Sequence, residues 1–164
     1  MKSLISIITA ISLVNISFAQ DSAKQSSLSQ LLATYLDIKN ALVGSDAAKA
    51  AAKATEFVKA LAAVDMNTMS EGDLKAFNSI QPKLKSDAQI IAATSKIELQ
   101  RNAFSTLSNN VYTLAKSVKL SVEPVYQQYC PMKKMYWLSS ETAIKNPYYG
   151  NAMLTCGSVT DTLK

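Results

Sequence analysis

The stretch SKIELQRNAFSTLSNNVYTLAKSV, residues 95–118, has the most regular helical pattern of the chain. Its apolar residues recur every three or four positions, which places them on one side of a helix. They are Ile97, Phe104, Leu107, Val111, Leu114, Ala115 and Val118. Ser95 and Glu98 have the spacing of a capping box, in which the two side chains bind each other's backbone N–H groups at the start of a helix. We therefore predict an amphipathic helix that begins at Ser95 and buries one face.

Arg101 lies on the apolar side of this predicted helix. Its guanidinium could anchor the C-terminal part of the chain or bind an anionic partner. Alternatively, its aliphatic stem lies along the core and the guanidinium reaches solvent at the rim, as long cationic side chains commonly do. We prefer this last interpretation.

Three further amphipathic patterns precede this helix, over residues 28–43, 45–64 and 70–91. Pro82 interrupts the third pattern and predicts a kink or a restart. Residues 20–27 are small and polar and predict a flexible lead-in. Four amphipathic helices joined by short connections are typical of an all-α fold, an antiparallel four-helix bundle. We expect residues 20–164 to form this single domain.

The helical pattern ends near residue 121, and the segment from about 121 to 164 is different in kind. Pro124, Pro131 and Pro147 exclude a long helix there. The segment is rich in aromatic residues, which must pack on one end or face of the bundle. Residues 136–138 and 159–163 have the composition of short strands, and the segment could include a short β-hairpin. We predict an irregular C-terminal segment packed on the bundle.

The first 19 residues predict a secretory signal peptide. Lys2 supplies the basic start, the apolar run of residues 4–14 follows, and Ser17 and Ala19 are the small residues that a signal peptidase recognises. Cleavage after Ala19 would release an exported protein, which is periplasmic in a Gram-negative host. The apolar run is too short to span a bilayer permanently, so we expect no membrane span.

The composition excludes several classes of function. The chain contains no histidine, which removes the commonest general base and the commonest metal ligand, so we expect no enzymatic activity. The formal net charge is +5, and the positive residues are spread along the chain. Without a basic stripe interleaved with aromatic residues, nucleic acid is an unpromising partner.

The C-terminal segment concentrates the sulfur chemistry of the chain. Both cysteines and three of the six methionines lie between residues 125 and 157. Thiolates and thioethers are soft ligands that suit Cu(I). One candidate is therefore a metal site made of Cys130, Met132, Met153 and Cys156, with Met135 as a weaker ligand. Met153 and Cys156 are three positions apart, so one helical turn would bring their sulfurs to the same side.

The alternative is a structural disulfide between Cys130 and Cys156, with the methionines as core residues. Exported proteins meet an oxidising environment, which favours this alternative. The two states could also interconvert, since oxidation to the disulfide would abolish thiolate binding. A third possibility is a pair of inert buried thiols, and the sequence leaves all three open.

Three blocks carry a resemblance to a known family. They are QRNAFSTLSNNVYTLAKS at 100–117, VYQQYCPMKKMYWLSS at 125–140 and IKNPYYGNAMLTCGSV at 144–159. Together they resemble DUF3347, a bacterial family of exported proteins that occur alone or attached to the periplasmic adaptors of heavy-metal efflux pumps. The resemblance implies periplasmic handling of heavy metals, with copper as the expected metal and an efflux adaptor or another envelope protein as partner.

The resemblance also limits the ligands. Some relatives carry histidines in the helices, where this chain has Ile90, Leu99 and Ala103, so only the cysteine and methionine set carries over. Two functions follow as hypotheses. The first is a periplasmic soft-metal module that buffers copper or delivers it to an efflux adaptor. The second is a disulfide-stapled protein-interaction module without metal.

Overall fold

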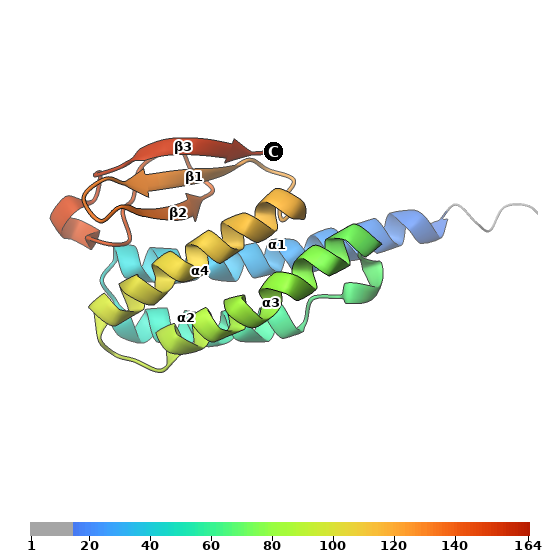
Figure 1. The fold of residues 1–164 in the computed structure, drawn as a ribbon, viewed down its shortest axis with the longest axis horizontal. Helices are drawn as coiled ribbons and strands as arrows, with labels where there is room; N and C mark the ends of the chain where they lie inside the picture. Colours follow the sequence, from blue (N-terminus) through green and yellow to red (C-terminus); the bar gives the residue numbers. More distant parts are fainter. Residues whose placement is uncertain (1–14) are drawn as a thin grey trace, which may run out of the picture.

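The computed structural model describes the backbone of residues 15–164 and the side chains from residue 27 onward. This range contains four α-helices followed by a small sheet, and consecutive helices pack side by side in opposite directions (Figure 1). The helices are α1 (Asn15–Val43), α2 (Ala47–Ala62), α3 (Glu71–Ala92) and α4 (Ile97–Ser117). The four predicted helices are confirmed.

Two details of the N-terminal half differ from the predictions. Helix α1 begins at Asn15, so residues 20–27 are helical rather than a flexible lead-in. Helix α3 runs through Pro82 as one helix and does not restart there. Residues 1–14, which hold most of the predicted signal peptide, lie outside the described residues.

The helix starts follow from their capping residues. Asp46 caps α2 by accepting a hydrogen bond from the N–H of Lys49 at 2.9 Å. Ser70 caps α3 in the same way, accepting from the N–H of Asp73 at 3.2 Å. Such caps satisfy backbone donors that have no partner within the helix.

The predicted capping box of α4 is wrong. The helix has Lys96 at its N-cap position and no side-chain cap, because it begins one residue later than the Ser95–Glu98 spacing requires. The Glu98 carboxylate instead accepts a hydrogen bond from Arg101 at 2.7 Å.

The bundle core lies between the apolar faces of the helices. Tyr35, Phe57, Phe77 and Phe104 are fully buried, one from each helix. Tyr35 and Phe104 stack with their ring centroids 5.2 Å apart, which joins the first helix to the last. Burial of such large rings is the main source of stability in a domain of this size.

The C-terminal segment forms an antiparallel sheet, which corrects the prediction of an irregular segment. Its elements are β1 (Val125–Cys130), β2 (Met135–Ser139), the short 3-10 helix η2 (Gly150–Met153) and β3 (Ser158–Leu163). The strand order is β2-β1-β3, with both pairs antiparallel. The predicted strands at 136–138 and 159–163 are confirmed as β2 and β3, and β1 with β2 forms the hairpin.

The central strand β1 is the element that the sequence did not predict. Prolines flank it on both sides, and a bulge between Gln127 and Gln128 interrupts its pairing with β3. A bulge breaks the alternation of buried and exposed residues, so both glutamines are buried. The regular period-two pattern that predicts a strand is therefore absent.

The sheet packs on α1 and α4, as expected for the aromatic segment (Figure 1). Tyr35 makes the deepest polar contact between the two layers. Its hydroxyl accepts a hydrogen bond from the N–H of Leu138 at 2.9 Å and shares another with Ser108 at 2.8 Å. Closer to the C-terminal end of α4, the Tyr112 hydroxyl donates a hydrogen bond to the Asp161 carboxylate of β3 at 2.6 Å.

None of the helices in residues 15–164 combines the length and the apolar character needed to cross a membrane.

Candidate thiol site

The pairing of β1 with β3 brings the two cysteines together. Cys130 ends β1, and Cys156 lies just before β3, whose residue Ser158 pairs with Tyr129. The register of β1 with β3 sets the two side chains beside each other, and both are free thiols. Cys130 is fully buried and Cys156 is partly exposed. The structure therefore forms a thiol pair with one inner and one outer member.

The environment favours the protonated form of the outer thiol. Partial burial raises the pKa of Cys156, and the charge and the hydrogen bond of Cys130 raise that pKa further. The thiolate is the form of cysteine that acts as a nucleophile and as a metal ligand. The raised pKa therefore disfavours both roles in the protein without a bound cation. A bound soft cation would supply the missing positive charge.

The three candidate methionines lie at different depths. Met135 is the cross-strand partner of Cys130 in β2 and packs, partly buried, against the core. Met132 lies in the β1–β2 turn and is 63% exposed, and Met153 ends η2 and is 36% exposed. The Cys156 N–H donates to the Met153 carbonyl at 3.1 Å, so these two residues are joined by a turn.

The five candidate sulfur ligands thus divide into two groups. The structure places Cys130 and Cys156 in contact, with Met135 directly across the strand pair. Met132 and Met153 lie in the turns next to the two cysteines, with their side chains open to solvent. Their participation as ligands stays a prediction. In the described part of the chain, acidic residues and cysteines form no group of three or more that could hold a metal.

Buried aromatic rings lie in the same core as the inner thiol. Trp137 is buried and meets the edge of Tyr148 with ring centroids 5.9 Å apart. The Tyr148 hydroxyl donates to the Tyr136 carbonyl. Burial raises the pKa of Tyr148, with further contributions from Tyr35 and Cys130, so this ring lies close to the thiol pair and stays neutral. A bare thiolate at Cys130 would be poorly solvated here.

The connection between β2 and β3 covers the face of the sheet that Gln128 and Trp137 share as cross-strand partners. The Gln128 side chain donates to the carbonyls of Glu141 at 2.8 Å and of Thr142 at 3.3 Å. Gly157 fits against the sheet, because a Cβ at this position would lie 2.8 Å from the Tyr129 carbonyl. Its φ of +151° also favours glycine.

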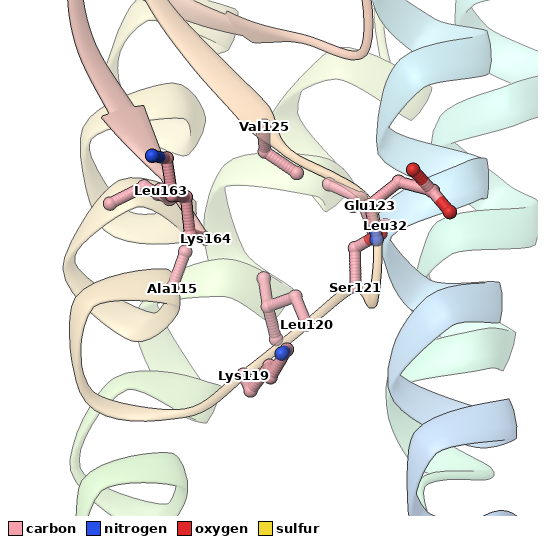
Figure 2. Close-up of a pocket in the computed structure, with 9 residues that line it drawn as sticks. All are labelled: Leu32, Ala115, Lys119, Leu120, Ser121, Glu123, Val125, Leu163 and Lys164. Atoms are coloured by element: carbon pink, nitrogen blue, oxygen red, sulfur yellow. The ribbon is translucent and has the colours of Figure 1, made fainter.

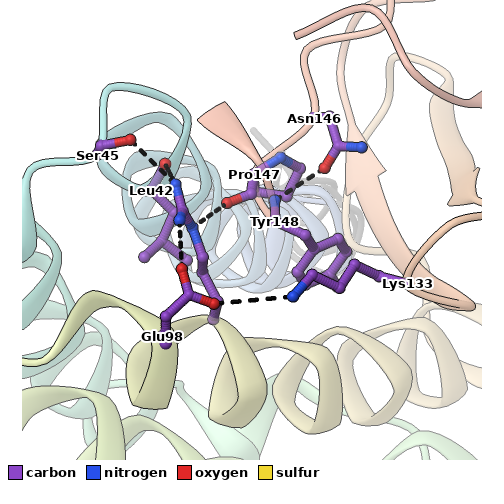
Figure 3. Close-up of polar contacts among 8 residues, drawn as sticks. Leu42, Ser45, Glu98, Lys133, Asn146, Pro147 and Tyr148 are labelled. Carbon is purple, nitrogen blue, oxygen red and sulfur yellow. Dashed lines mark hydrogen bonds and ion pairs between the residues drawn. The ribbon is translucent and has the colours of Figure 1, made fainter. Parts of the chain in front are cut away.

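Arg101 fastens this connection to the bundle through three partners that are labelled in Figure 3, Leu42, Ser45 and Pro147. Its Nε donates to the Pro147 carbonyl at 3.0 Å, and its Nη2 donates to Ser45 at 3.0 Å and to the Leu42 carbonyl at 3.4 Å. The Arg101 side chain is 9% exposed. The preferred interpretation, with the guanidinium at the rim, is wrong. Arg101 anchors the C-terminal segment, which was one of the alternatives.

A second contact supports the same junction. The ammonium of Lys133, in the β1–β2 turn, lies 3.8 Å from Glu98 and 5.2 Å from the centre of the Tyr149 ring. Lys133 therefore links the turn beside the thiols to α4 and to the segment that Arg101 holds (Figure 3).

Two hollows of the described surface lie away from the thiols. One lies where α4 leads into β1 (Figure 2). Its lining residues are Leu32, Ala115, Lys119, Leu120, Ser121, Glu123, Val125, Leu163 and Lys164. The volume open to a water molecule there is about 20 Å³, enough for roughly one water. An open groove between α2 and α3 is lined mainly by apolar side chains and by Lys85. Neither gathers groups suited to catalysis.

These features define a helical bundle that carries a small antiparallel sheet with a thiol pair at its end. Residues 31–123 match the family described as "Protein of unknown function (DUF3347)". The match spans more than half of the 164 residues, so the chain belongs to this family. The matched residues end before β1, so both cysteines lie beyond them. Comparison with curated proteins and with solved structures found no match.

Proposed function

We propose that this chain is an exported soft-metal protein that binds Cu(I) between Cys130 and Cys156. The proximity of the two thiols, which the pairing of β1 with β3 produces, carries the proposal, because two adjacent thiolates are a suitable soft ligand pair. The absence of histidine from the chain leaves sulfur as its soft donor.

The burial of the site supports a cation rather than a reactive thiol. Two thiolates side by side repel each other, and Cys130 is fully buried. A monovalent soft cation offsets this repulsion and leaves the pair with a single negative charge. Met135 is the thioether that strand pairing sets opposite Cys130, while Met132 and Met153 would complete the coordination from the solvent side.

The cellular setting of the proposal is the periplasm. The predicted signal peptide supports export, and the resemblance to proteins attached to efflux adaptors supports delivery of copper to such an adaptor. The exposed thioethers lie in the chain segments next to the two cysteines, where a metal would enter or leave.

A disulfide between the same two cysteines is the second candidate. The thiol contact favours it equally, because a disulfide also requires adjacent sulfurs. Closing this loop would stabilise the fold by roughly 3–4 kcal/mol in the chain-entropy model. The protein would then serve as a stapled module that docks on an envelope partner.

A competition experiment with a chromophoric Cu(I) chelator separates the two candidates. Reduced protein purified from the periplasm should take Cu(I) from the chelator, and Cys130→Ser or Cys156→Ser should abolish tight binding. Met135→Leu should weaken binding while preserving the fold, because leucine and methionine have similar volumes. Met66→Leu is the matched control, since Met66 is 42% exposed and lies in the 3-10 helix η1 (Met66–Thr68), remote from the sheet.

The contrary results are equally specific. Reduced wild-type protein that leaves the chelator fully loaded refutes the copper site. A mass lower by two hydrogens in the protein as isolated, with a melting temperature that falls on reduction, establishes the disulfide instead.

A further inference from the structure

Asn146 is a fully buried polar residue that closes the loop between β2 and β3. Its side-chain N–H donates to the Cys156 carbonyl at 2.8 Å, and its backbone N–H donates to the Leu154 carbonyl at 2.8 Å. Its side-chain oxygen accepts from the N–H of Tyr148 at 2.8 Å, and its backbone carbonyl accepts from the N–H of Gly150 at 3.1 Å. All the hydrogen-bonding groups of Asn146 thus serve this one loop.

The two thiols depend on Asn146 to different degrees. Cys130 is the last residue of the central strand, is fully buried and pairs with Met135 of β2, so the sheet holds it in place. Cys156 precedes β3, an edge strand with mostly exposed residues. Apart from the turn to Met153, the Asn146 side chain makes the hydrogen bond that holds the backbone of Cys156.

The next residue connects this hydrogen bond to the bundle. Arg101 holds the carbonyl of Pro147, so Asn146 sits beside a point that is fixed to α4 and to the α1–α2 turn (Figure 3). The carbonyl of Cys156 is therefore held relative to the bundle through one amide side chain.

We propose that Asn146 is a positioning residue that holds Cys156 against Cys130. It does not touch either sulfur. Without its side-chain N–H, the backbone of Cys156 is free to swing toward solvent while Cys130 stays in the sheet. The metal part of this inference rests on the proposed function, whereas the placement of the thiol does not.

The test compares the two cysteines within the same folded protein. Asn146→Asp keeps the size of the side chain and an oxygen for the N–H of Tyr148, but it turns a carboxylate oxygen toward the Cys156 carbonyl. Asn146→Ser is the second variant, since its short hydroxyl can still accept from Tyr148 but is too short for Cys156. Asn151→Asp, at an exposed position of η2, controls for the added charge.

The readout is the rate at which iodoacetamide labels each cysteine in the full reduced chain, resolved by peptide mass spectrometry. In the Asn146 variants, labelling of Cys156 should rise about tenfold while Cys130 stays protected. Leu61→Ala, in the core of α2, lowers the global stability without touching the site and should raise the labelling of both cysteines together. A common rise of both cysteines in the Asn146 variants, or an unchanged rate at Cys156, overturns the inference.

Copper binding gives the second readout. Mutation of a residue that orients a metal ligand typically lowers metal affinity by about 10–100-fold. We therefore expect Asn146→Asp to lower the Cu(I) affinity by at least about tenfold. If wild-type protein binds copper and Asn146→Asp binds it equally well, the role of Asn146 in the metal site is overturned. If wild-type protein binds no copper, the proposed function fails and the labelling experiment still decides the positioning role.

Discussion

Replacing Gly150 by alanine should loosen the whole junction between sheet and bundle. Gly150 has a φ of +55°, in the left-handed region that residues with a Cβ rarely adopt. A Cβ at this position would lie 2.5 Å from Ser45 Oγ, 2.9 Å from the Val43 carbonyl and 3.0 Å from Arg101 Nη2. The methyl group would thus enter the place where the segment meets the α1–α2 turn.

The magnitude follows from two costs. The left-handed backbone costs an alanine about 1 kcal/mol. The Val43 carbonyl belongs to the last turn of α1, so the 146–150 segment has to move instead, which breaks the hydrogen bond from Arg101 to the Pro147 carbonyl. Hydrogen bonds to a charged group contribute about 1.5–3 kcal/mol each. We therefore expect Gly150→Ala to lower the free energy of unfolding by about 3 kcal/mol, and the melting temperature by roughly 6–12 °C.

Urea unfolding of the reduced full chain, followed by circular dichroism, measures this loss. Gly44→Ala is the matched control, because the nearest atoms to a Cβ at Gly44 lie at 3.6 and 3.7 Å and its backbone is not left-handed. The control should change the stability by less than about 1 kcal/mol. If Gly150→Ala is no more destabilising than Gly44→Ala, the described fit of the segment against the bundle is incorrect.

Two further substitutions test the buried charges. Arg101→Lys should destabilise the protein by about 2–4 kcal/mol in urea unfolding, because a single ammonium leaves some of the carbonyls of Pro147 and Leu42 without a donor, whereas a loss below about 0.5 kcal/mol would contradict the anchor. Lys39→Met should stabilise the protein at neutral pH, because Lys39 is only 4% exposed and its burial lowers the pKa of its ammonium below the ordinary 10.5, despite the nearby charge of Glu141. The folded state then binds the proton more weakly than the unfolded state, so the cost of burying the charge is complete below the folded pKa and is relieved as pH rises from the folded pKa to about 10.5. The advantage of Lys39→Met should shrink over that alkaline range, and a constant difference from pH 7 to 10.5 would show that the Lys39 ammonium has an ordinary pKa.

The helices were predictable because their signals are local. The apolar residues of each helix recur at a spacing that can be recognised in the sequence without knowing which element the helix packs against. The N-cap residue Ser70 is likewise next to the helix that it caps. The failures in this half are at the helix ends, where one residue decides the outcome, and at Pro82 inside α3. Ser95 lies one position too early to cap α4, and Pro82 fits within α3 because a neighbouring helix pair supports the helix around it.

The arrangement of the candidate site could be predicted from the sequence to a much smaller extent than the helices. Sequence alone identified Cys130 and Cys156 as chemically unusual, since their residue type and their segment are visible directly. Their contact arises from the pairing of β1 with β3, and β1 is the strand whose pattern the bulge at Gln127 and Gln128 conceals. Asn146 had one sequence signal, the turn-forming Asn-Pro pair, which does not indicate that its amide reaches Cys156.

Arg101 shows the same division most clearly. Its sequence position placed it on the apolar face of α4, and several uses of a guanidinium were compatible with that position. Only the folded chain brings Ser45, Leu42 and Pro147 around it, from segments that lie far apart in the sequence. The sequence by itself determined the helices, the two strands flanking β1 and the chemistry available to the thiols. The tertiary structure alone decided which side chains meet, because such contacts depend on strand register and helix packing, and these are settled by the burial of the whole chain rather than by any local segment.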